Sequence, residues 1–297
     1  MDNRPPFIVV PELSNSNFFR GGIACPTIRS AASLLAAAGS IEVIDLSKVR
    51  FMRPYQVAIV AALAEDQHLR GGALSYLPPE DDRAREHLVR LGLPGIILRT
   101  SDDGSVEQRT TNLPIRVLVG RPDLSFGWET TRVLTGGLGR DLPAGLECEI
   151  AEGIDEMVLN AATHSDSQIG CVVVGQAFPK TGVLEVTVLD VGVTIRGHLS
   201  KAPKHQDLSG DASAIERALE DGVTGTIGRN RFGEPNSGAG FASLCRFLDA
   251  TGGDVSILSG SAIVCRRARG SPRVQPLKCP PFRGTLVNIS FATPAGF

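Results

Sequence analysis

The stretch that most constrains the fold runs from residue 146 to residue 165. Read as a helix at about 100° per residue, it places its apolar side chains on one stripe: Ile150, Ile154, Met157 and Ala161. Glu156, Asn160 and His164 follow one another at intervals of four residues. They therefore stack along one edge of the stripe. The sequence predicts a long amphipathic helix with an acid, an amide and an imidazole on one edge.

That edge has the chemistry of a magnesium–nucleotide site. The side-chain oxygen of Asn160 can ligate a hard cation, and Glu156 can orient or deprotonate a water. The small side chains of Ala161 and Ala162 leave room for a ligand against the helix. An amphipathic helix with ordinary polar edges explains this stretch equally well when it is taken alone.

Glu156-x-x-x-Asn160-Ala161-x-x-His164 resembles the N box of the Bergerat-type ATP-binding fold. That fold is shared by gyrase, heat-shock chaperone, mismatch-repair and histidine-kinase ATPases and by anti-sigma-factor serine kinases. Further stretches follow in the family's order: 189–195 like the first glycine box, 236–241 with 251–260 like the second, and 284–291 like the closing Gly-Thr strand.

The resemblance implies a role for each matching residue. Glu156 would be the catalytic base, and Asn160 would ligate Mg²⁺. Asp190 would accept a hydrogen bond from the exocyclic amine of adenine, although a turn aspartate that stabilises its own loop is the alternative. Thr194 stands where the family usually has a second glycine, and a β-branched residue does not easily take positive φ. The expected ATP-contacting set is Asn160, His164, Asp190, Gly192, Gly238, Gly240 and Thr285.

Residues 1–98 show short apolar strands alternating with helices, including a helix over 54–69, which implies βαβ units. Within this part, residues 41–52 and the elements after them resemble a STAS domain, the fold of anti-sigma-factor antagonists. That family carries a phosphorylatable serine at the start of the next helix. Here the turn is Arg53-Pro54-Tyr55-Gln56, so the resemblance implies an interaction module without that switch.

The expected fold class is therefore α/β. A STAS-like domain (1–98) and a polar linker (99–114) precede a two-layer α/β sandwich that binds ATP (115–297). In the second domain, residues 196–237 correspond to the ATP lid, and its cations are candidates for the γ-phosphate. We expect a loop over 266–281, Trp128 in a core or between domains on a short helix that stops before Gly136, and His87 on a helix surface.

Charge and composition narrow the function classes. A chain of 297 residues with a net charge of −2 has no global basic field, so nucleic acid is an unlikely partner. The six cysteines are scattered without a C-x-x-C pair, which favours free thiols in a reducing cytoplasm. The first residues do not resemble a signal peptide, and the longest apolar run is too short for a membrane span.

Three functions stay open on these grounds. The first is an ATP-hydrolysing conformational switch with Mg²⁺ that acts on a protein partner. The second is a protein serine kinase of the anti-sigma type, and the third is a nucleotide-binding scaffold without hydrolysis. The partner would be a STAS protein or a sigma or anti-sigma-type regulator, and a homodimer is compatible with the family. A sensor histidine kinase is disfavoured because residues 115–145 contain no histidine.

Overall fold

The computed structural model describes residues 7–9, 41–100, 111–123, 125–139, 142, 145–226, 240–277 and 280–292. Within these residues the chain is mixed α/β with two sheets. One is a small parallel sheet of three strands in the order β1-β2-β3. The other is an antiparallel sheet of seven strands in the order β4-β5-β6-β10-β7-β8-β9.

The large sheet is built around apolar strands that are buried on both faces. Val173 and Val188 belong to one hydrophobic core, whereas Val172 and Leu189 belong to another on the opposite face. This alternation follows from the two-residue repeat of a strand. The strands are β4 (Asn112–Leu118), β5 (Cys171–Phe178), β6 (Val183–Asp190), β7 (Asp254–Gly260), β8 (Ala262–Arg267), β9 (Arg273–Pro276) and β10 (Phe282–Ala292).

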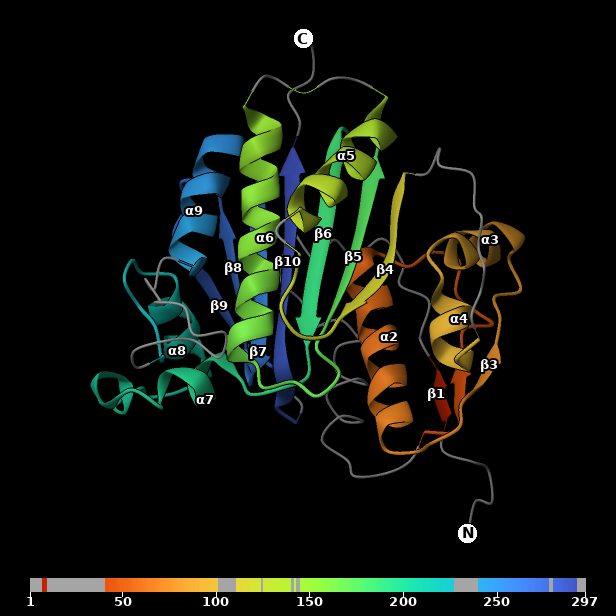
Figure 1. The fold of residues 1–297 in the computed structure, drawn as a ribbon, viewed down its shortest axis with the longest axis horizontal. Helices are drawn as coiled ribbons and strands as arrows, with labels where there is room; N and C mark the ends of the chain where they lie inside the picture. The colour runs from red at the N-terminus through yellow and green to blue at the C-terminus, as the bar shows by residue number, and fades with distance from the viewer. Residues whose placement is uncertain are drawn as a thin grey trace.

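Helices α5 (Phe126–Leu138), α6 (Leu146–His164) and α9 (Gly240–Thr251) cover the first face of this sheet (Figure 1). The helix predicted over 146–165 is confirmed as α6. Its stripe is buried as expected, with Ile150 and Ile154 at 0% exposure. The long central helix therefore carries the predicted polar edge along the margin of the core.

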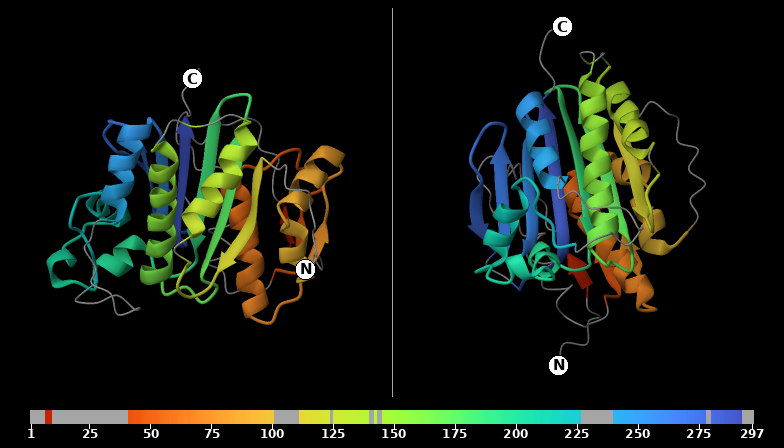
Figure 2. Two further views of the ribbon diagram at one scale, coloured as in Figure 1. Left: turned by 45° about the horizontal axis from the view of Figure 1, so that its top comes forward. Right: turned by 60° about the vertical axis from the view of Figure 1, so that its left-hand side comes forward.

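Helix α2 (Pro54–Leu69) packs against β5 and β6 on the second face of the sheet. Its bounds are those predicted, with Pro54 in the first turn and the Gln56 side chain accepting from the Arg53 backbone N–H at 2.8 Å. Around α2 lie β1 (Phe7–Val9), β2 (Val43–Asp45), β3 (Ser75–Leu77), α3 (Asp82–Arg90) and α4 (Leu93–Leu98). Figure 2 shows this orange part against the β4–β6 side of the sheet.

The N-terminal part and the large sheet share one hydrophobic core. Side chains of α2 such as Val57 and Ile59 belong to the same cluster as Val172 and Val174 of β5. The expected two-layer sandwich thus has a third layer over part of its second face. Strand β4 begins at Asn112, inside the segment expected as a linker over 99–114.

The segment after β6 contains three short helices where it is described. It contains α7 (Ile195–Leu199), the short 3-10 helix η1 (Pro203–His205) and α8 (Asp211–Ala218). The prediction of a loop over 266–281 is wrong, because β8 extends to Arg267 and β9 pairs with it from Arg273 to Pro276.

Three side-chain and helix-end predictions are also wrong. Trp128 is 43% exposed, because it lies on the outer face of α5. That helix continues through Gly136 and ends at Gly139, whose φ of 68° terminates it. His87 is 8% exposed rather than on a surface, because it stacks on Phe51 and contacts the side chain of Asn112 in β4.

Candidate functional site

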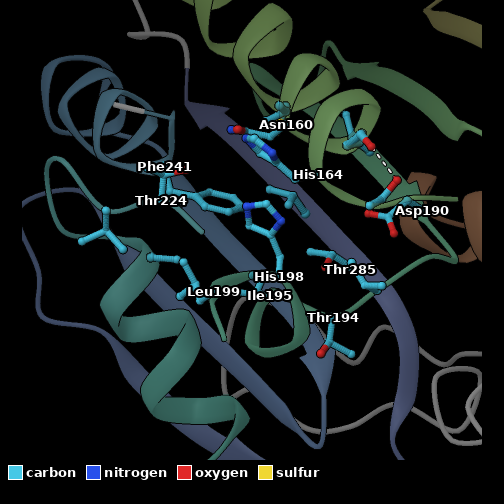
Figure 3. Close-up of a pocket in the computed structure, with 18 residues that line it drawn as sticks. Asn160, His164, Asp190, Thr194, Ile195, His198, Leu199, Thr224, Phe241 and Thr285 are labelled. Carbon is cyan, nitrogen blue, oxygen red and sulfur yellow. Dashed lines mark hydrogen bonds between the residues drawn. The ribbon is translucent and has the colours of Figure 1, made fainter. Parts of the chain in front are cut away.

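A pocket opens where α6, the ends of β6 and β10, α7 and the start of α9 meet (Figure 3). Its empty volume, with the open solvent at its mouth included, is about 720 Å³. Four of the residues predicted from the sequence line it together. They are Asn160, His164, Asp190 and Thr285. The other lining residues are largely apolar, as is usual for such pockets.

Helix α6 contributes Asn160 and His164 to the pocket, one turn apart. The Asn160 Nδ2 donates to Glu156 Oε1 at 3.3 Å. Glu156 does not line this pocket but a neighbouring hollow between α6, α9 and the segment 121–123 that precedes α5. Burial raises the pKa of the Glu156 carboxyl, and the hydrogen bond from Asn160 opposes that shift. A raised pKa brings a carboxylate closer to the range of a general base.

Asp190 ends β6 opposite Thr285 of β10 and is only 3% exposed. Its Oδ1 accepts from the backbone N–H of Gly192 at 2.9 Å. Burial raises the pKa of Asp190 to about 7, while the backbone N–H groups of Gly192 and Thr285 act in the opposite direction. The carboxyl is therefore a buried acceptor, placed in a largely apolar pocket.

Two glycines shape the loop around Asp190 by allowing close backbone contacts. A Cβ on Gly192 would lie 1.8 Å from the carbonyl oxygen of Ser165, where α6 ends. The next residue, Val193, donates its N–H to that same oxygen at 2.6 Å. Gly284 has a φ of 90°, and its Cβ would lie 2.0 Å from the Asp190 carbonyl oxygen. Gly192 itself is outside the pocket lining, so its described role is to pack the loop.

Thr194 occupies the position where the family usually has a glycine, and it is not strained. Its φ of −71° and ψ of 164° are extended, and it is the N-cap of α7. The Thr194 Oγ1 accepts from the Gly197 N–H at 3.1 Å, which is the usual function of a threonine cap. The loop therefore turns directly into a helix instead of requiring positive φ here.

The hydroxyl of Ser259 in β7 joins three segments at the base of the pocket. It accepts from the Ile195 N–H at 3.0 Å and donates to the Gly284 carbonyl oxygen at 3.0 Å. It also shares a hydrogen bond of 3.1 Å with the Thr285 hydroxyl. These bonds fix the start of α7 and the bulge of β10 relative to each other.

His198 of α7 also lines the pocket, and the sequence analysis did not identify it. Its ring lies 4.4 Å from the ring of His164, centroid to centroid, with the planes tilted by 35°. A signal was available: Thr194 is a good N-cap, and Ile195 and Leu199 have the spacing of one apolar helical turn. In such a turn His198 lies three residues after Ile195 and therefore on the same side of the helix.

Of residues 236–241, which resemble the second glycine box, only Gly240 and Phe241 are described; Gly240 begins α9, and Phe241 lines the pocket. Gly238 lies outside the described residues, as do Arg229 and Arg231 of the expected lid. No lysine or arginine of the described residues lines the pocket. The other lid cations lie elsewhere: Lys201 pairs with Asp166 at 2.8 Å, Arg217 pairs with Glu220, and Arg196 donates to the Leu208 carbonyl oxygen.

In the described part of the chain, no three His, Cys, Asp or Glu side chains are grouped so that they could hold a metal ion. A magnesium ion would therefore have one protein ligand of the predicted kind, the Asn160 side-chain oxygen. This donor set fits an ion that arrives with a nucleotide, because Mg²⁺ commonly keeps waters and binds through substrate phosphates.

The chain matches no protein-family model, and it matches no curated protein. Of the helices within the described residues, none combines the length and the apolar character needed to cross a membrane.

Proposed function

We propose that this chain is a Mg²⁺-dependent ATP-binding regulatory protein, and that it acts on a protein partner as an ATP-hydrolysing conformational switch. One observation carries the proposal. Four residues chosen for their resemblance to the Bergerat-type motifs, from three separate segments of the sequence, converge on one pocket: Asn160, His164, Asp190 and Thr285. In the same proposal, the large sheet with α6 and α9 is a Bergerat-type domain, and the N-terminal part is STAS-like.

The chemistry of the pocket supports adenine as the base. Asp190 is acceptor-only when ionised, which suits the exocyclic amine of adenine but not the carbonyl oxygen of guanine. The apolar side chains of Val188, Ile195 and Val287 in the lining offer the flat surfaces of a base an apolar environment. Asn160 would hold the magnesium ion, which would neutralise phosphate charge when bound. Glu156 would accept a proton from the attacking water.

Strand β10 offers a route from the pocket to the N-terminal part. Thr285 lines the pocket, and Arg283, two residues earlier, forms an ion pair with Asp66 of α2. Gly284 lies between them in a register shift of the strand. A ligand that moves the Thr285 backbone would therefore also move Arg283 and its ion pair with Asp66 of α2. This connection favours a switch over a scaffold that only binds nucleotide.

A protein serine kinase of the anti-sigma type is the second candidate. The observation in its favour is that Glu156 lines a hollow outside the pocket, where the hydroxyl of another protein could approach. The N-terminal part of the same chain is a poor substrate. Its Arg53 turn, where STAS domains carry their serine, packs against β6 on the opposite face. A separate STAS protein or a sigma-type regulator would be the substrate.

The test is to incubate the purified full chain with γ-labelled ATP and Mg²⁺, with and without a cytosolic extract. If the unaltered chain releases free phosphate and Glu156→Ala binds ATP without releasing it, the result would support the switch. Label on an extract protein would establish the kinase instead. Absence of any ATP binding would overturn the proposal.

A further inference from the structure

His198 reaches the centre of the pocket from the one-turn helix α7. In Figure 3 its imidazole faces that of His164, which comes from α6, and the ring of Phe241 lies beside them. Three rings from three separate elements thus gather in one place. Gly225 packs closely behind His198, since a Cβ there would lie 2.2 Å from the His198 carbonyl oxygen. The position of His198 is therefore well defined by its surroundings.

Neither ring nitrogen of His198 has a hydrogen-bond partner among the described residues, although both are buried. Burying an unpaired polar group costs free energy, and an apolar ring of the same shape would avoid this cost. The contacts of the described residues thus do not explain the imidazole. A buried polar group without a partner calls for an explanation, and a bound ligand atom would supply one.

The charge of His198 limits what that ligand atom can be. Burial lowers the pKa of His198 to about 4, and the positive charges of His164 and Lys201 act in the same direction while Asp166 opposes them. At neutral pH the ring is therefore uncharged, with one N–H donor and one nitrogen acceptor. Such a group suits neutral hydroxyl and ring-nitrogen partners. It suits phosphate oxygens less well, because they only accept and prefer cationic donors.

We propose that His198 is a recognition residue for the uncharged nucleoside part of the ligand, held in place by its contact with the ring of His164. The proposal deepens the nucleotide-binding function proposed above and rests on it. His198 and Asp190 would be the two polar contacts to the nucleoside within the described pocket. The phosphates would be held by other residues.

The experiment measures binding of adenine, adenosine and Mg·ATP to the full chain by titration calorimetry, together with thermal unfolding without ligand. In His198→Phe an aromatic ring stays next to His164, but both polar atoms are lost. We expect adenosine and Mg·ATP to bind about 5- to 10-fold more weakly, the range of one lost neutral hydrogen bond. The melting temperature should stay equal or rise. His198→Gln, which keeps a donor and an acceptor, should recover part of the affinity.

The matched control is His205→Phe, another buried histidine of the same segment that does not line the pocket. Its adenosine affinity should equal that of the unaltered chain. An equal loss of adenosine affinity in His198→Phe and His205→Phe would overturn the proposal. The effect would then come from a general disturbance of the segment that carries both histidines. Unfolding of both His198 variants would overturn it too, since His198 would then be structural.

The ligands separate the remaining outcomes. Weaker binding of adenosine but not adenine would assign His198 to the ribose, and weaker binding of all three ligands would assign it to the base; both support the proposal. A loss for Mg·ATP alone would overturn it. If the unaltered chain bound none of the three, the proposed function would fail, whereas unchanged binding in His198→Phe would refute only the role of His198.

Discussion

Arg53, the N-cap of α2, donates to the fully buried carboxylate of Glu185 in β6 at 2.5 Å. The guanidinium also lies over the ring of Phe178, 5.1 Å from its centroid. Burial raises the pKa of Glu185, and the charge of Arg53 opposes that shift. This ion pair ties the N-terminal part to the centre of the large sheet.

Removing one side of this pair should be costly. In Arg53→Met, Glu185 is left as an unpaired buried acid, and we expect the free energy of unfolding to fall by roughly 3 kcal/mol at pH 8. The Glu185 pKa would rise further without its cation, so the folded state would bind more protons than the unfolded state. Stability would then fall as pH rises above the ordinary carboxyl range.

Urea unfolding at pH 5 and pH 8 measures this dependence. The loss should be smaller at pH 5, where Glu185 can be protonated. Adding Glu185→Gln to Arg53→Met should restore much of the stability at pH 8. An identical loss at both pH values would show that the charge of Glu185 is not the cause.

Gly284→Ala should damage the pocket through the backbone. The residue has a φ of 90°, and a Cβ would collide with the Asp190 carbonyl oxygen. We expect a loss of at least about 1–2 kcal/mol in unfolding free energy, from the cost of positive φ alone, and weaker ATP binding. Thermal unfolding and calorimetry measure the two effects.

Gly136→Ala is a matched control for that variant, because Gly136 lies within α5 and no atom would be near the added Cβ. Alanine should stabilise this helix by about 0.5–1 kcal/mol and leave ATP binding unchanged. Equal changes of stability and ATP binding in Gly284→Ala and Gly136→Ala would contradict the steric role assigned to Gly284.

Asp190→Asn should change both selectivity and pH dependence. Asparagine can donate as well as accept, so it could pair with the carbonyl oxygen of guanine, and the preference for ATP over GTP should fall. The folded chain holds a proton on Asp190 up to about pH 7, whereas the ordinary value is 3.8. Ionisation of Asp190 therefore lowers stability as pH rises from about 4 to 7.

The asparagine variant should not show that loss, so it should gain stability relative to the unaltered chain at pH 8 but not at pH 4. Competition between ATP and GTP and thermal unfolding at the two pH values test both halves. An unaltered preference would remove Asp190 from base recognition.

Asn160→Ala should abolish the magnesium dependence of ATP binding, because it removes the one predicted protein ligand of the ion. It also removes the donor to Glu156 Oε1. Titration with ATP in Mg²⁺ and in EDTA provides the measurement. Binding that is still strengthened by Mg²⁺ would exclude Asn160 from the metal site.

The long periodic segments were predictable from sequence because local spacing decides them. Helix α2 has its predicted bounds, and α6 differs only at its last residue. Asn160 and His164 could be placed together because both lie on that one helix, four residues apart. Their meeting with Asp190 and Thr285 followed from resemblance and not from spacing, since strand pairing across some hundred residues leaves no local pattern.

Other features depend on tertiary context that the sequence alone does not contain. His87 is buried because strand β4, which begins inside the segment expected as a linker, reaches it, and Trp128 is exposed because α5 turns that face outward. His198 was not predicted as a site residue because it belongs to none of the motifs on which the resemblance rests. The packing of α2 on the large sheet could not be predicted, because hydrophobic periodicity identifies a buried face but not the element that covers it.

The core shared by α2 and the large sheet has a consequence for how the chain unfolds. Separating residues 1–98 from the remainder would uncover Val172, Val174 and Leu189 on one side and most of α2 on the other. Neither fragment would keep a complete interior, so both would tend to aggregate in water. We therefore expect the intact chain to lose its structure in a single cooperative step.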